Sequence, residues 1–541
     1  MTAFIYRSPL PDIELVNTDL VSYLCSNPYN SPDGRSVFVD ALTGESRTYK
    51  NVIQRTKPVA HGLRKLGVKP GDVVAILSPN SIEFPVLCFA ILSCDATVCP
   101  MESQAKFIIA HSSFLDTARK AVQDTQVKGI IQADGAKVLP GCIIHPSCYG
   151  FGTDPAELLS ERPAFICFSS GIPGAAKGVI ITHQNMTANL QQWEIVYYHG
   201  VSPSPAIIAF VPFDPIYGIN VFVCGGFLRG QTTVVLSRFD REVYLHSIQC
   251  YKPVEPHLVP PIALLLVNDI MVELNDISGI KRILSAAVPM STELATTFER
   301  RFNDRYGTVV HYHQSLGSTE TSPLAMGVLP TKMEKQQTVG CIAHNMEFRF
   351  VNPETMEDVP QGNPDSELKP AEILCRGPNV TKGYFHNAEA TQGAFYTDAQ
   401  GYQWLRTSDI AVMDKDGYII IHDRIKGMIK YKGLQVIPSE LEGKLQEHPD
   451  IVDCGVTALF DEAQATELPV AFVVLKHEAK QDQPELVKKR IHQWLNAKVA
   501  NHKKLRGGIE FVSTIPKSPS GKILRRELRE ALKLKKTNAK L

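Results

Sequence analysis

The residues best suited to chemistry lie in the stretch Ile166-Cys-Phe-Ser-Ser-Gly-Ile-Pro-Gly-Ala-Ala-Lys-Gly178. An apolar run gives way to small hydroxyl residues and glycines, and a single lysine, Lys177, follows. Hydroxyls and free backbone N–H groups can face an anion, glycines let the backbone approach it, and a lysine neutralises its charge. The stretch is not a Walker A loop, because Ala176 stands where that motif needs glycine. The pattern indicates a phosphate-binding loop, although alone it also fits an ordinary strand–turn–strand.

Further polar motifs follow this loop along the chain. Thr319 and Glu320 put a hydroxyl beside a carboxylate after a glycine turn, which suits holding Mg²⁺ against phosphate oxygens. The stretch Trp404-Leu-Arg-Thr-Ser-Asp409 predicts an acid at a strand end, where it could accept both hydroxyls of a ribose. Each motif alone also fits a helix cap or a solvated basic face, but their occurrence together favours one nucleotide site. The remaining motifs are basic: Asp423-Arg424, Lys430-Tyr-Lys432-Gly433 and Gly521-Lys522.

Composition narrows the class of protein. At 541 residues the chain is too long for one hydrophobic core, so two or more domains are expected. Lys+Arg and Asp+Glu balance at 56 each, which argues against nucleic acid as a general partner. The 12 cysteines include no CxxC pair, so we expect reduced thiols in an intracellular protein and neither a zinc site nor a disulfide framework. We expect no signal peptide, and the apolar runs are too short to span a bilayer.

The elements that must position these residues follow an alternating pattern. Apolar strands and amphipathic helices alternate through the first part of the chain, which predicts α/β layering. A strand at Gly71–Leu77 precedes a helix at Glu83–Leu92, and further strands are predicted at 207–212, 232–237 and 282–287. Beyond about residue 425 the segments become short and charged, which predicts a small α+β unit. We therefore predict an α/β domain over residues 1–425 and a second domain over residues 426–541.

The motifs together resemble the adenylate-forming (AMP-binding) superfamily of acyl-CoA synthetases, luciferases and peptide-synthetase adenylation domains. The likeness is greatest to the 4-coumarate–CoA ligase branch and its peroxisomal acyl-CoA ligases, and it runs from about residue 35 to 530. It rests on the phosphate loop, Ser-Thr-Glu-Thr-Ser-Pro, Arg376-Gly-Pro-Asn-Val-Thr-Lys-Gly-Tyr384, Tyr431-Lys-Gly-Leu-Gln-Val and Pro516-Lys-Ser-Pro-Ser-Gly-Lys522. The resemblance implies a large N-terminal α/β domain of several subdomains and a mobile C-terminal lid that turns about Lys426.

The resemblance also implies an ATP-dependent carboxylate–CoA ligase that uses Mg²⁺ and forms an acyl-adenylate. Lys522, Thr319 and Glu320 would be catalytic, with Thr319 on the α-phosphate and Glu320 ligating the metal. Lys432 and Gly433 would receive the CoA thiol after the lid has turned. The pocket for an aryl or medium-to-long acyl group would include Tyr217, Val221 and Ala286. The other residues expected to bind ATP, adenylate or CoA are Ser169, Ser170, Gly171, Gly174, Lys177, Ala287, Gln314, Ser315, Asp409, Arg424, Lys430 and Arg238.

The chain departs from the family pattern at four places. Ile172-Pro173 replaces a pair of hydroxyl residues in the phosphate loop, which predicts weaker binding of the β- and γ-phosphates. Asp214-Pro215 replaces the Phe-His whose histidine gates the acyl tunnel, and Leu316 replaces the tyrosine that stacks on adenine. After Met101 a segment of about one short helix is missing. Either the fold tolerates the excision, or the sequence is that of a truncated product or of a faulty gene model.

Two other functions compete with the ligase. Phe213-Asp214 resembles the Phe-Asp of peptide-synthetase domains, which would make the protein an amino-acid-adenylating enzyme. The altered loop and missing helix would also fit a catalytically weakened paralogue. Against the latter, Thr319, Glu320 and Lys522 are all present.

The chain ends in Ala539-Lys540-Leu541, which is similar to the Ser-Lys-Leu address read by the peroxisomal import receptor. The stretch before it is polar and basic, so we expect it to be exposed. The sequence therefore predicts a peroxisomal matrix enzyme, and a cytoplasmic one without that signal.

Overall fold

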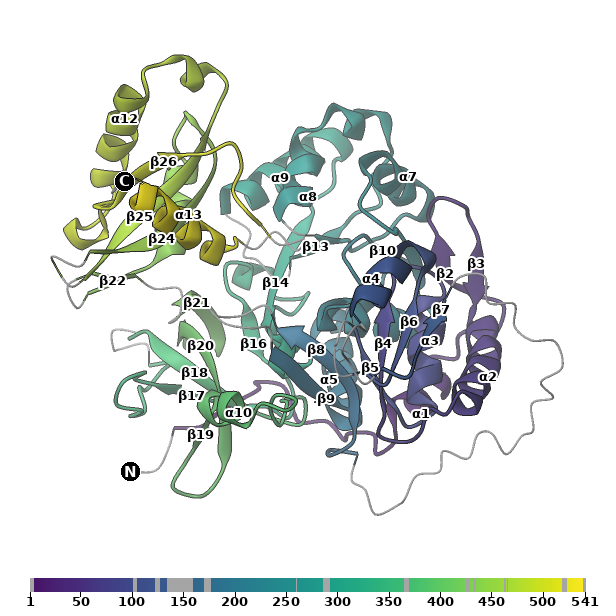
Figure 1. The fold of residues 1–541 in the computed structure, drawn as a ribbon. Coiled ribbons are helices and arrows are strands. Elements are labelled where there is room, and N and C mark those ends of the chain that lie inside the picture. Colours follow the sequence, from purple (N-terminus) through teal and green to yellow (C-terminus); the bar gives the residue numbers. More distant parts are fainter. Residues whose placement is uncertain are drawn as a thin grey trace. The chain divides into compact units, whose positions relative to one another are not determined.

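The structure of the protein, a computed structural model, describes residues 4–100, 105–121, 127–133, 159–169, 177–258, 260–285, 292–363, 369–424, 429–431, 434–461, 464, 466–517 and 523–538. Its backbone contacts divide the chain into two compact units. The first unit comprises Met1–Arg349 and Leu374–Arg406, and the second comprises Phe350–Ile373 and Thr407–Leu541. The mixed α/β architecture agrees with the predicted fold class (Figure 1).

A six-stranded sheet of the first unit holds the two strands that flank the predicted phosphate loop. Its strand order is β7-β6-β4-β5-β8-β9, in which only β9 is antiparallel to its neighbour. The predicted strand and helix near residues 71–92 are confirmed at β4 and α3, and α3 is buried all round because every residue of it is apolar. The strands and nearby helices are β4 (Val73–Leu77), β5 (Thr97–Cys99), β6 (Phe107–Ala110), β7 (Gly129–Gln132), β8 (Pro163–Ser169), β9 (Lys177–Thr182), α1 (Leu20–Cys25), α2 (Tyr49–Lys65), α3 (Phe84–Leu92), α4 (Leu115–Ala121) and α5 (His183–Tyr198).

The missing segment after Met101 falls in the connection from β5 to β6. These strands lie on either side of β4 and are parallel to it. Only residues 100–106 connect them, whereas parallel strands usually need a crossover of a dozen or more residues. Both strands are nevertheless fully buried and in register with β4.

A four-stranded sheet, in the order β10-β11-β2-β3, forms the second layer of the first unit. Its parallel strands β10 and β11 confirm the predicted strands near residues 207 and 232. Helices α7, α8 and α9 gather beside it (Figure 1) and share one hydrophobic core with its strands, to which Val234, Leu245 and Phe298 contribute. The elements are β2 (Ser36–Asp40), β3 (Ser46–Thr48), β10 (Ala206–Ala209), β11 (Thr232–Val235), the π-helix η3 (Gly218–Gly225), α6 (Gly226–Leu228), α7 (Arg241–Tyr251), α8 (Pro260–Asn268) and α9 (Thr292–Tyr306).

Strand β14 carries the chain from this core to the Thr319-Glu320 motif. It pairs in parallel with β13 and antiparallel with β15, and a register shift at Leu316/Gly317 ends the regular ladder. The predicted strand at 282–287 is confirmed through Ser285, and the residues after it lie outside the described ones. These and the other strands of the first unit are β12 (His257–Leu258), β13 (Arg282–Ser285), β14 (His311–Gly317), β15 (Leu324–Gly327), β16 (Gly340–Ile342), β1 (Tyr6–Arg7) and β19 (Phe395–Thr397), with helix α10 (Ala388–Ala394). Strands β17 (Glu347–Val351), β18 (Ala371–Arg376) and β20 (Gln403–Met413) contribute residues to both units.

The second unit has its own core and mixes helices with a small sheet. Strands β24-β25-β26 form the sheet, and buried residues such as Leu441, Val473 and Ile491 pack between it and the helices. The buried carboxylate of Glu442 is held by Arg525 at 2.7 Å. Its elements are β21 (Tyr418–Arg424), β22 (Ile429–Tyr431), β23 (Leu434–Val436), β24 (Ile451–Asp461), β25 (Thr466–Leu475), β26 (Gly508–Phe511), α11 (Pro438–Gln446), α12 (Pro484–Asn496) and α13 (Arg525–Asn538).

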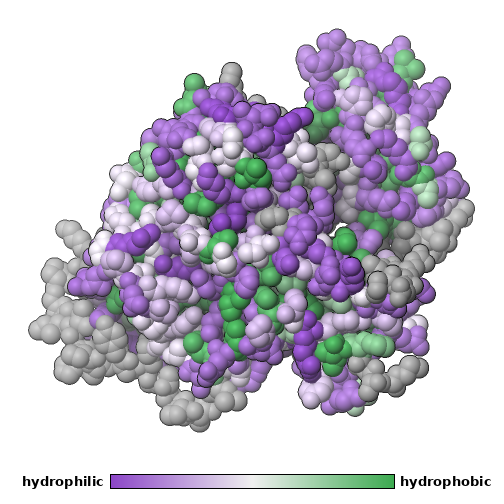
Figure 2. All heavy atoms as spheres, turned by 180° about the vertical axis from the view of Figure 1, so that it is seen from behind, coloured by the Kyte–Doolittle hydropathy of each residue, from purple (hydrophilic) through white to green (hydrophobic). Residues whose placement is uncertain are grey.

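The surface and the cysteines are those of an ordinary globular chain. The face drawn in Figure 2 is mostly hydrophilic, with hydrophobic residues scattered in small groups. Within the described ranges every cysteine is free. A search of the same ranges finds no helix with the length and apolar character needed to cross a membrane.

Buried His313 on β14 predicts acid-sensitive stability. Burial lowers its pKa to about 3, and neither ring nitrogen has a hydrogen-bond partner among the residues that the structure describes. The histidine of the unfolded chain titrates near pH 6.5. Between about pH 6.5 and pH 3, the unfolded chain therefore binds a proton at this histidine and the folded chain does not. His313 therefore destabilises the fold as pH falls through this window, by up to about 1.4 kcal/mol per pH unit.

The substitution His313→Leu should remove this dependence, because it replaces an unsatisfied polar ring with an apolar side chain. Thermal unfolding between pH 7.5 and 5 should show a smaller drop in midpoint for the variant than for the unsubstituted protein. Equal drops would contradict this account of His313.

Candidate active site

Strands β8 and β9 bring the two ends of the phosphate motif together. Ser169, the last residue of β8, pairs with Lys177, the first residue of β9, and both are half-buried. The predicted loop between them, residues 170–176, lies outside the described residues. Gly178 is required by close packing, since a Cβ there would lie 2.9 Å from Cγ2 of Ile166. The antiparallel pairing thus fixes the position of Lys177, the residue that directly follows the loop.

Tyr384, at the end of the Arg376–Tyr384 motif, lies directly beside this lysine. The Nζ of Lys177 is 4.9 Å from the centre of the Tyr384 ring, within the range of a cation–π contact. The backbone N–H of Phe385 donates to the carbonyl of Gly178 at 2.7 Å, which holds the tyrosine segment against β9. Two motifs far apart in sequence therefore meet at this tyrosine.

The turn after β14 presents the predicted metal ligand to the same tyrosine. Residues Thr319–Thr321 form one turn of 3-10 helix, and the N–H of Ser318 donates to the carbonyl of Pro323 at 3.0 Å to close it. The hydroxyl of Tyr384 donates to Oε1 of Glu320 at 2.9 Å. Burial, together with the neighbouring carboxylate, raises the pKa of Tyr384, so the hydroxyl keeps its proton.

Lys177, Tyr384 and Glu320 therefore form one cluster of a cation, a hydroxyl and a carboxylate. Thr319 and Glu320 are half-buried, so the turn retains accessible surface. Within the described residues, no three histidine, cysteine, aspartate or glutamate side chains could hold a metal by themselves. A carboxylate oxygen is a ligand that Mg²⁺ prefers, and this ion usually shares one or two carboxylates with substrate phosphates and water. Glu320, which shares Tyr384 as a neighbour with Lys177, fits that pattern.

A network of buried amide side chains forms hydrogen bonds with the backbone carbonyls of the turn after β14. Asn379 donates to the carbonyls of Thr321 and Leu324, both at 2.8 Å. Asn189 donates to the Leu324 carbonyl at 2.9 Å, and Asn220 donates to the Ser322 carbonyl at 2.9 Å. All three amide residues are buried, so these bonds satisfy backbone carbonyls that water cannot reach. The network fixes the backbone that follows Thr319 and Glu320.

The predicted ribose ligands lie in the second unit. Asp409 on β20 and Arg424 on β21 are directly paired in an antiparallel ladder, and Asp409 is buried. The backbone N–H of Asp409 donates to the hydroxyl of Thr407 at 3.0 Å. Lys430 lies on β22.

Of the predicted acyl-pocket residues, Tyr217 directly precedes the π-helix η3 and Val221 lies within it. Gly218 is required at this point, since a Cβ would lie 2.3 Å from the carbonyl oxygen of Pro212. Gln314, Ser315 and Leu316 are half-buried on β14, whereas Arg238 is exposed after β11. The predicted site residues outside the described ranges are Ser170, Gly171, Gly174, Ala286, Ala287, Lys426, Lys432, Gly433 and Lys522.

Several residues of this region were missed by reasoning from the sequence. Tyr384 is the last residue of the Arg376–Tyr384 motif. Its place in that motif was a signal in the sequence that it belongs to the site. The buried amides had no such signal, because their partners are carbonyls distant in sequence. His257, whose Nδ1 lies 2.6 Å from the Tyr217 hydroxyl, was equally unmarked.

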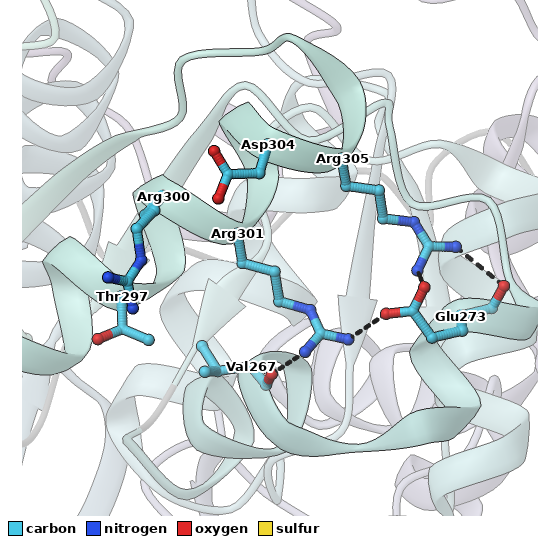
Figure 3. A pocket seen from close by; sticks show the side chains of 7 residues that line it. All are labelled: Val267, Glu273, Thr297, Arg300, Arg301, Asp304 and Arg305. Carbon is cyan, nitrogen blue, oxygen red and sulfur yellow. Dashed lines mark hydrogen bonds and ion pairs between the residues drawn. The ribbon is translucent and has the colours of Figure 1, made fainter.

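A separate hollow of about 450 Å³ lies between α9 and the segment after α8. Figure 3 shows Arg301 and Arg305 both directed at the carboxylate of Glu273. Arg300 and Asp304 also line the hollow. Because its walls are charged and two of its arginines are already paired, it does not suit the apolar acyl group of the predicted substrate.

Comparison with known proteins identifies the family of this chain. Residues 26–385 match the family model of the AMP-binding enzyme, and residues 440–522 match the model of the AMP-binding enzyme C-terminal domain. The chain belongs to the AMP-binding enzyme family.

Curated relatives align over nearly the whole length. The chain is 32% identical to 4-coumarate–CoA ligase-like 6 of Arabidopsis thaliana, over 98% of this chain and 93% of the relative. It is also 32% identical to the peroxisomal OPC-8:0-CoA ligase 1 of Arabidopsis thaliana, over 100% of this chain and 97% of the relative. Among solved structures, the anthranilate CoA ligase AuaEII in complex with anthranoyl-AMP superimposes with a TM-score of 0.78 at 22% identity, covering 96% of this chain and 98% of that chain.

Proposed function

We propose that the protein is an ATP-dependent carboxylate–CoA ligase that activates an aryl or a medium-to-long-chain acid through an acyl-adenylate. The observation that carries the proposal is the cluster of Lys177, Tyr384 and Glu320, in which a cation and a carboxylate converge from separate motifs. Membership of the AMP-binding family and the names of the relatives support it.

The first half-reaction makes the carboxylate a usable acyl donor. A carboxylate oxygen attacks the α-phosphorus of ATP, the bond to the bridging oxygen breaks, and pyrophosphate leaves with that bond's electron pair. Ser169, Ser170, Gly171, Gly174 and Lys177 bind the phosphates, and Thr319 contacts the α-phosphate. Glu320 would hold Mg²⁺, which supplies positive charge against the phosphate oxygens when it is bound. Positioning and charge stabilisation by these residues supply most of the catalysis.

The second half-reaction transfers the acyl group to CoA. The thiol sulfur attacks the adenylate carbonyl, the C–O bond to AMP breaks, and the thiol proton is released. We propose that residues 426–541 form a lid that turns about Lys426, withdrawing Lys522 and presenting Lys432-Gly433 to the thiol. Asp409 and Arg424 bind the ribose, while Lys430 and Arg238 contact phosphates of the adenylate or CoA.

The acyl group would lie beside Tyr217, Val221 and Ser315, with Ala286 and Ala287 completing the pocket. Val221 is fully buried, and Tyr217 keeps part of its surface accessible. These side chains are uncharged, which suits an acid with an apolar body.

The test of this function is a panel of acids assayed for thioester formation with ATP, Mg²⁺ and CoA. Aryl-propenoic and medium-to-long fatty acids should give CoA thioesters with release of AMP and pyrophosphate. Pyrophosphate exchange driven by amino acids, and by none of these acids, would instead show an amino-acid-adenylating enzyme.

We also propose that the enzyme works in the peroxisomal matrix, with Ala539-Lys540-Leu541 as the signal for the import receptor. The peroxisomal OPC-8:0-CoA ligase among the relatives supports this location. A fluorescent protein carrying the last ten residues should enter peroxisomes, and one lacking the final three residues should stay outside. Cytosolic fluorescence of both fusions would contradict the proposal.

The substitution Tyr384→Phe tests the contact that defines the site. It removes the hydroxyl that donates to Glu320 and keeps the ring beside Lys177. A hydrogen bond to a charged group is worth about 1.5–3 kcal/mol, so kcat/KM for ATP should fall at least about tenfold. Steady-state kinetics with Tyr402→Phe, an exposed tyrosine of the same unit, provide the control. Unchanged kinetics of Tyr384→Phe would show that the contact does not serve catalysis.

A further inference from the structure

A short segment, residues 378–385, joins the turn that carries Glu320 to the strand that begins with Lys177. This strand, β9, lies at the edge of its six-stranded sheet and pairs with β8 on one side. The segment covers the other side, where the backbone N–H of Ile180 donates to the carbonyl of Gly383 at 3.1 Å. An edge strand needs such cover, because its outward backbone groups must find hydrogen-bond partners.

Thr381 is the residue of this segment that bonds to both sides. Its backbone N–H donates to the carbonyl of Glu320 at 2.8 Å. Its hydroxyl oxygen lies 2.5 Å from the carbonyl oxygen of Ile180 and 3.1 Å from that of Gly383. A hydroxyl has one proton, and the Gly383 carbonyl already accepts the Ile180 N–H, so the proton goes to the nearer Ile180 carbonyl. Thr381 therefore links the backbone of Glu320 to β9, three residues beyond Lys177.

The bond from the Thr381 hydroxyl differs from the other contact between the two motifs. Tyr384 holds the Glu320 carboxylate with its hydroxyl, but it meets Lys177 only through the face of its ring, 4.9 Å from Nζ. A hydrogen bond is directional and weakens steeply away from its preferred geometry, so it fixes a distance. Thr381 is buried, so water cannot readily replace its bonds. The spacing between the lysine strand and the Glu320 turn thus depends on this hydroxyl.

We propose that Thr381 is a positioning residue whose hydroxyl sets the separation of Lys177 and Glu320, so that both bind one ATP together with its Mg²⁺. The lysine binds phosphate oxygens directly, and the carboxylate binds them through the metal ion. The two contacts can add to one affinity only if the distance between them matches the ligand. The inference rests on the proposed ligase function, because it takes the phosphates of ATP as the shared ligand.

The test measures how much the binding of ATP tightens when Mg²⁺ is added, in the unsubstituted protein and in Thr381→Val. The probe is α,β-methylene-ATP, which cannot be cleaved between the α- and β-phosphates, and calorimetry gives its Kd in Mg²⁺ and in EDTA. Loss of a group that orients a metal ligand costs about 10–100-fold, so the tightening by Mg²⁺ should fall at least about tenfold in the variant. The Kd in EDTA should change by less than about threefold, because Lys177 binds phosphate without the metal ion.

Two further substitutions grade the effect, and one serves as a control. Thr381→Ser keeps the hydroxyl and should retain the tightening, whereas Thr381→Cys has a weaker donor and should give an intermediate value. Thr56 is a buried threonine of helix α2 whose hydroxyl also donates to a backbone carbonyl, that of Val52, at 2.9 Å. Thr56→Val should lower the thermal midpoint and leave the tightening by Mg²⁺ unchanged.

The outcomes separate this inference from the function on which it rests. A Thr381→Val protein with a lower thermal midpoint and unchanged tightening by Mg²⁺ would show that the hydroxyl only stabilises the fold. That result would overturn the inference and leave the ligase function standing. If Thr381→Val does not fold, unchanged tightening in Thr381→Cys overturns it equally. Failure of the unsubstituted protein to form a CoA thioester from any acid would refute the proposed function, and this inference with it.

Discussion

Replacing Gly317 by alanine is expected to abolish adenylate formation, with kcat/KM falling by more than about 100-fold. A methyl group at this position would lie 1.7 Å from the carbonyl oxygen of Pro323 and 2.7 Å from its carbonyl carbon. Both are backbone atoms of the turn that carries Thr319 and Glu320, so the turn must open to admit the methyl group. Opening it breaks the closing hydrogen bond from Ser318 to Pro323, which spans 3.0 Å. Thr319 and Glu320, which we propose to be catalytic, would then lose their positions.

The rest of the first unit should still fold in this variant, because the clash is confined to one turn. Overpacking of this kind costs about 1–3 kcal/mol, and the thermal midpoint should fall by several degrees. Gly62→Ala in helix α2 is the matched control, since a Cβ there meets no described residue within 4 Å. It should keep full activity and equal or greater stability. A fully active Gly317→Ala enzyme would show that the turn is not the site of chemistry.

The substitution Lys522→Ala is expected to separate the two half-reactions. We propose that the Lys522 ammonium bridges the carboxylate and the α-phosphate while negative charge concentrates between them. Loss of one such charge-stabilising group costs about 10²–10³ in rate, and adenylate formation should fall by this amount. Thioester formation from a supplied acyl-adenylate should change by less than about threefold, because the lysine has been withdrawn by then.

Lys517→Ala is the control for this variant. Lys517 belongs to the same C-terminal segment, and its ammonium pairs with Asp453 at 2.7 Å on the surface of the second unit. Such an exposed pair contributes about 0–1 kcal/mol, so both half-reactions should proceed normally. Equal loss of both half-reactions in Lys522→Ala would contradict the proposal that two lysine-bearing faces alternate.

Much of the fold could be predicted from the pattern of apolar residues along the chain, because buried strands and helices are visible in it. The strand at Val73–Leu77 and the fully buried helix Phe84–Leu92 were predictable because each is a continuous apolar run between polar segments. Periodicity says nothing about the conformation of Gly218–Gly225, where the structure has a π-helix. Nor does it show that β14 loses its register at Leu316/Gly317, since this depends on β15 across the ladder.

The candidate site divides in the same way. Lys177 and Glu320 could be selected from their motifs, because anion-binding loops and metal ligands need particular residue types. Their contacts with Tyr384 depend on the tertiary fold. The same is true of the hydrogen bonds that Asn379 and Asn189 donate to the backbone of the turn. Whether the loop holding Ile172-Pro173 binds ATP weakly stays a prediction.

The most direct test of the account is to follow the oxygen of the acid. The enzyme is supplied with ATP, Mg²⁺, CoA and an accepted acid labelled with ¹⁸O in both carboxylate oxygens, and the AMP is analysed by mass spectrometry. Attack of the carboxylate on the α-phosphorus, followed by cleavage at the carbonyl, predicts one ¹⁸O atom in each AMP. Unlabelled AMP, or ADP and labelled inorganic phosphate in its place, would contradict an acyl-adenylate mechanism.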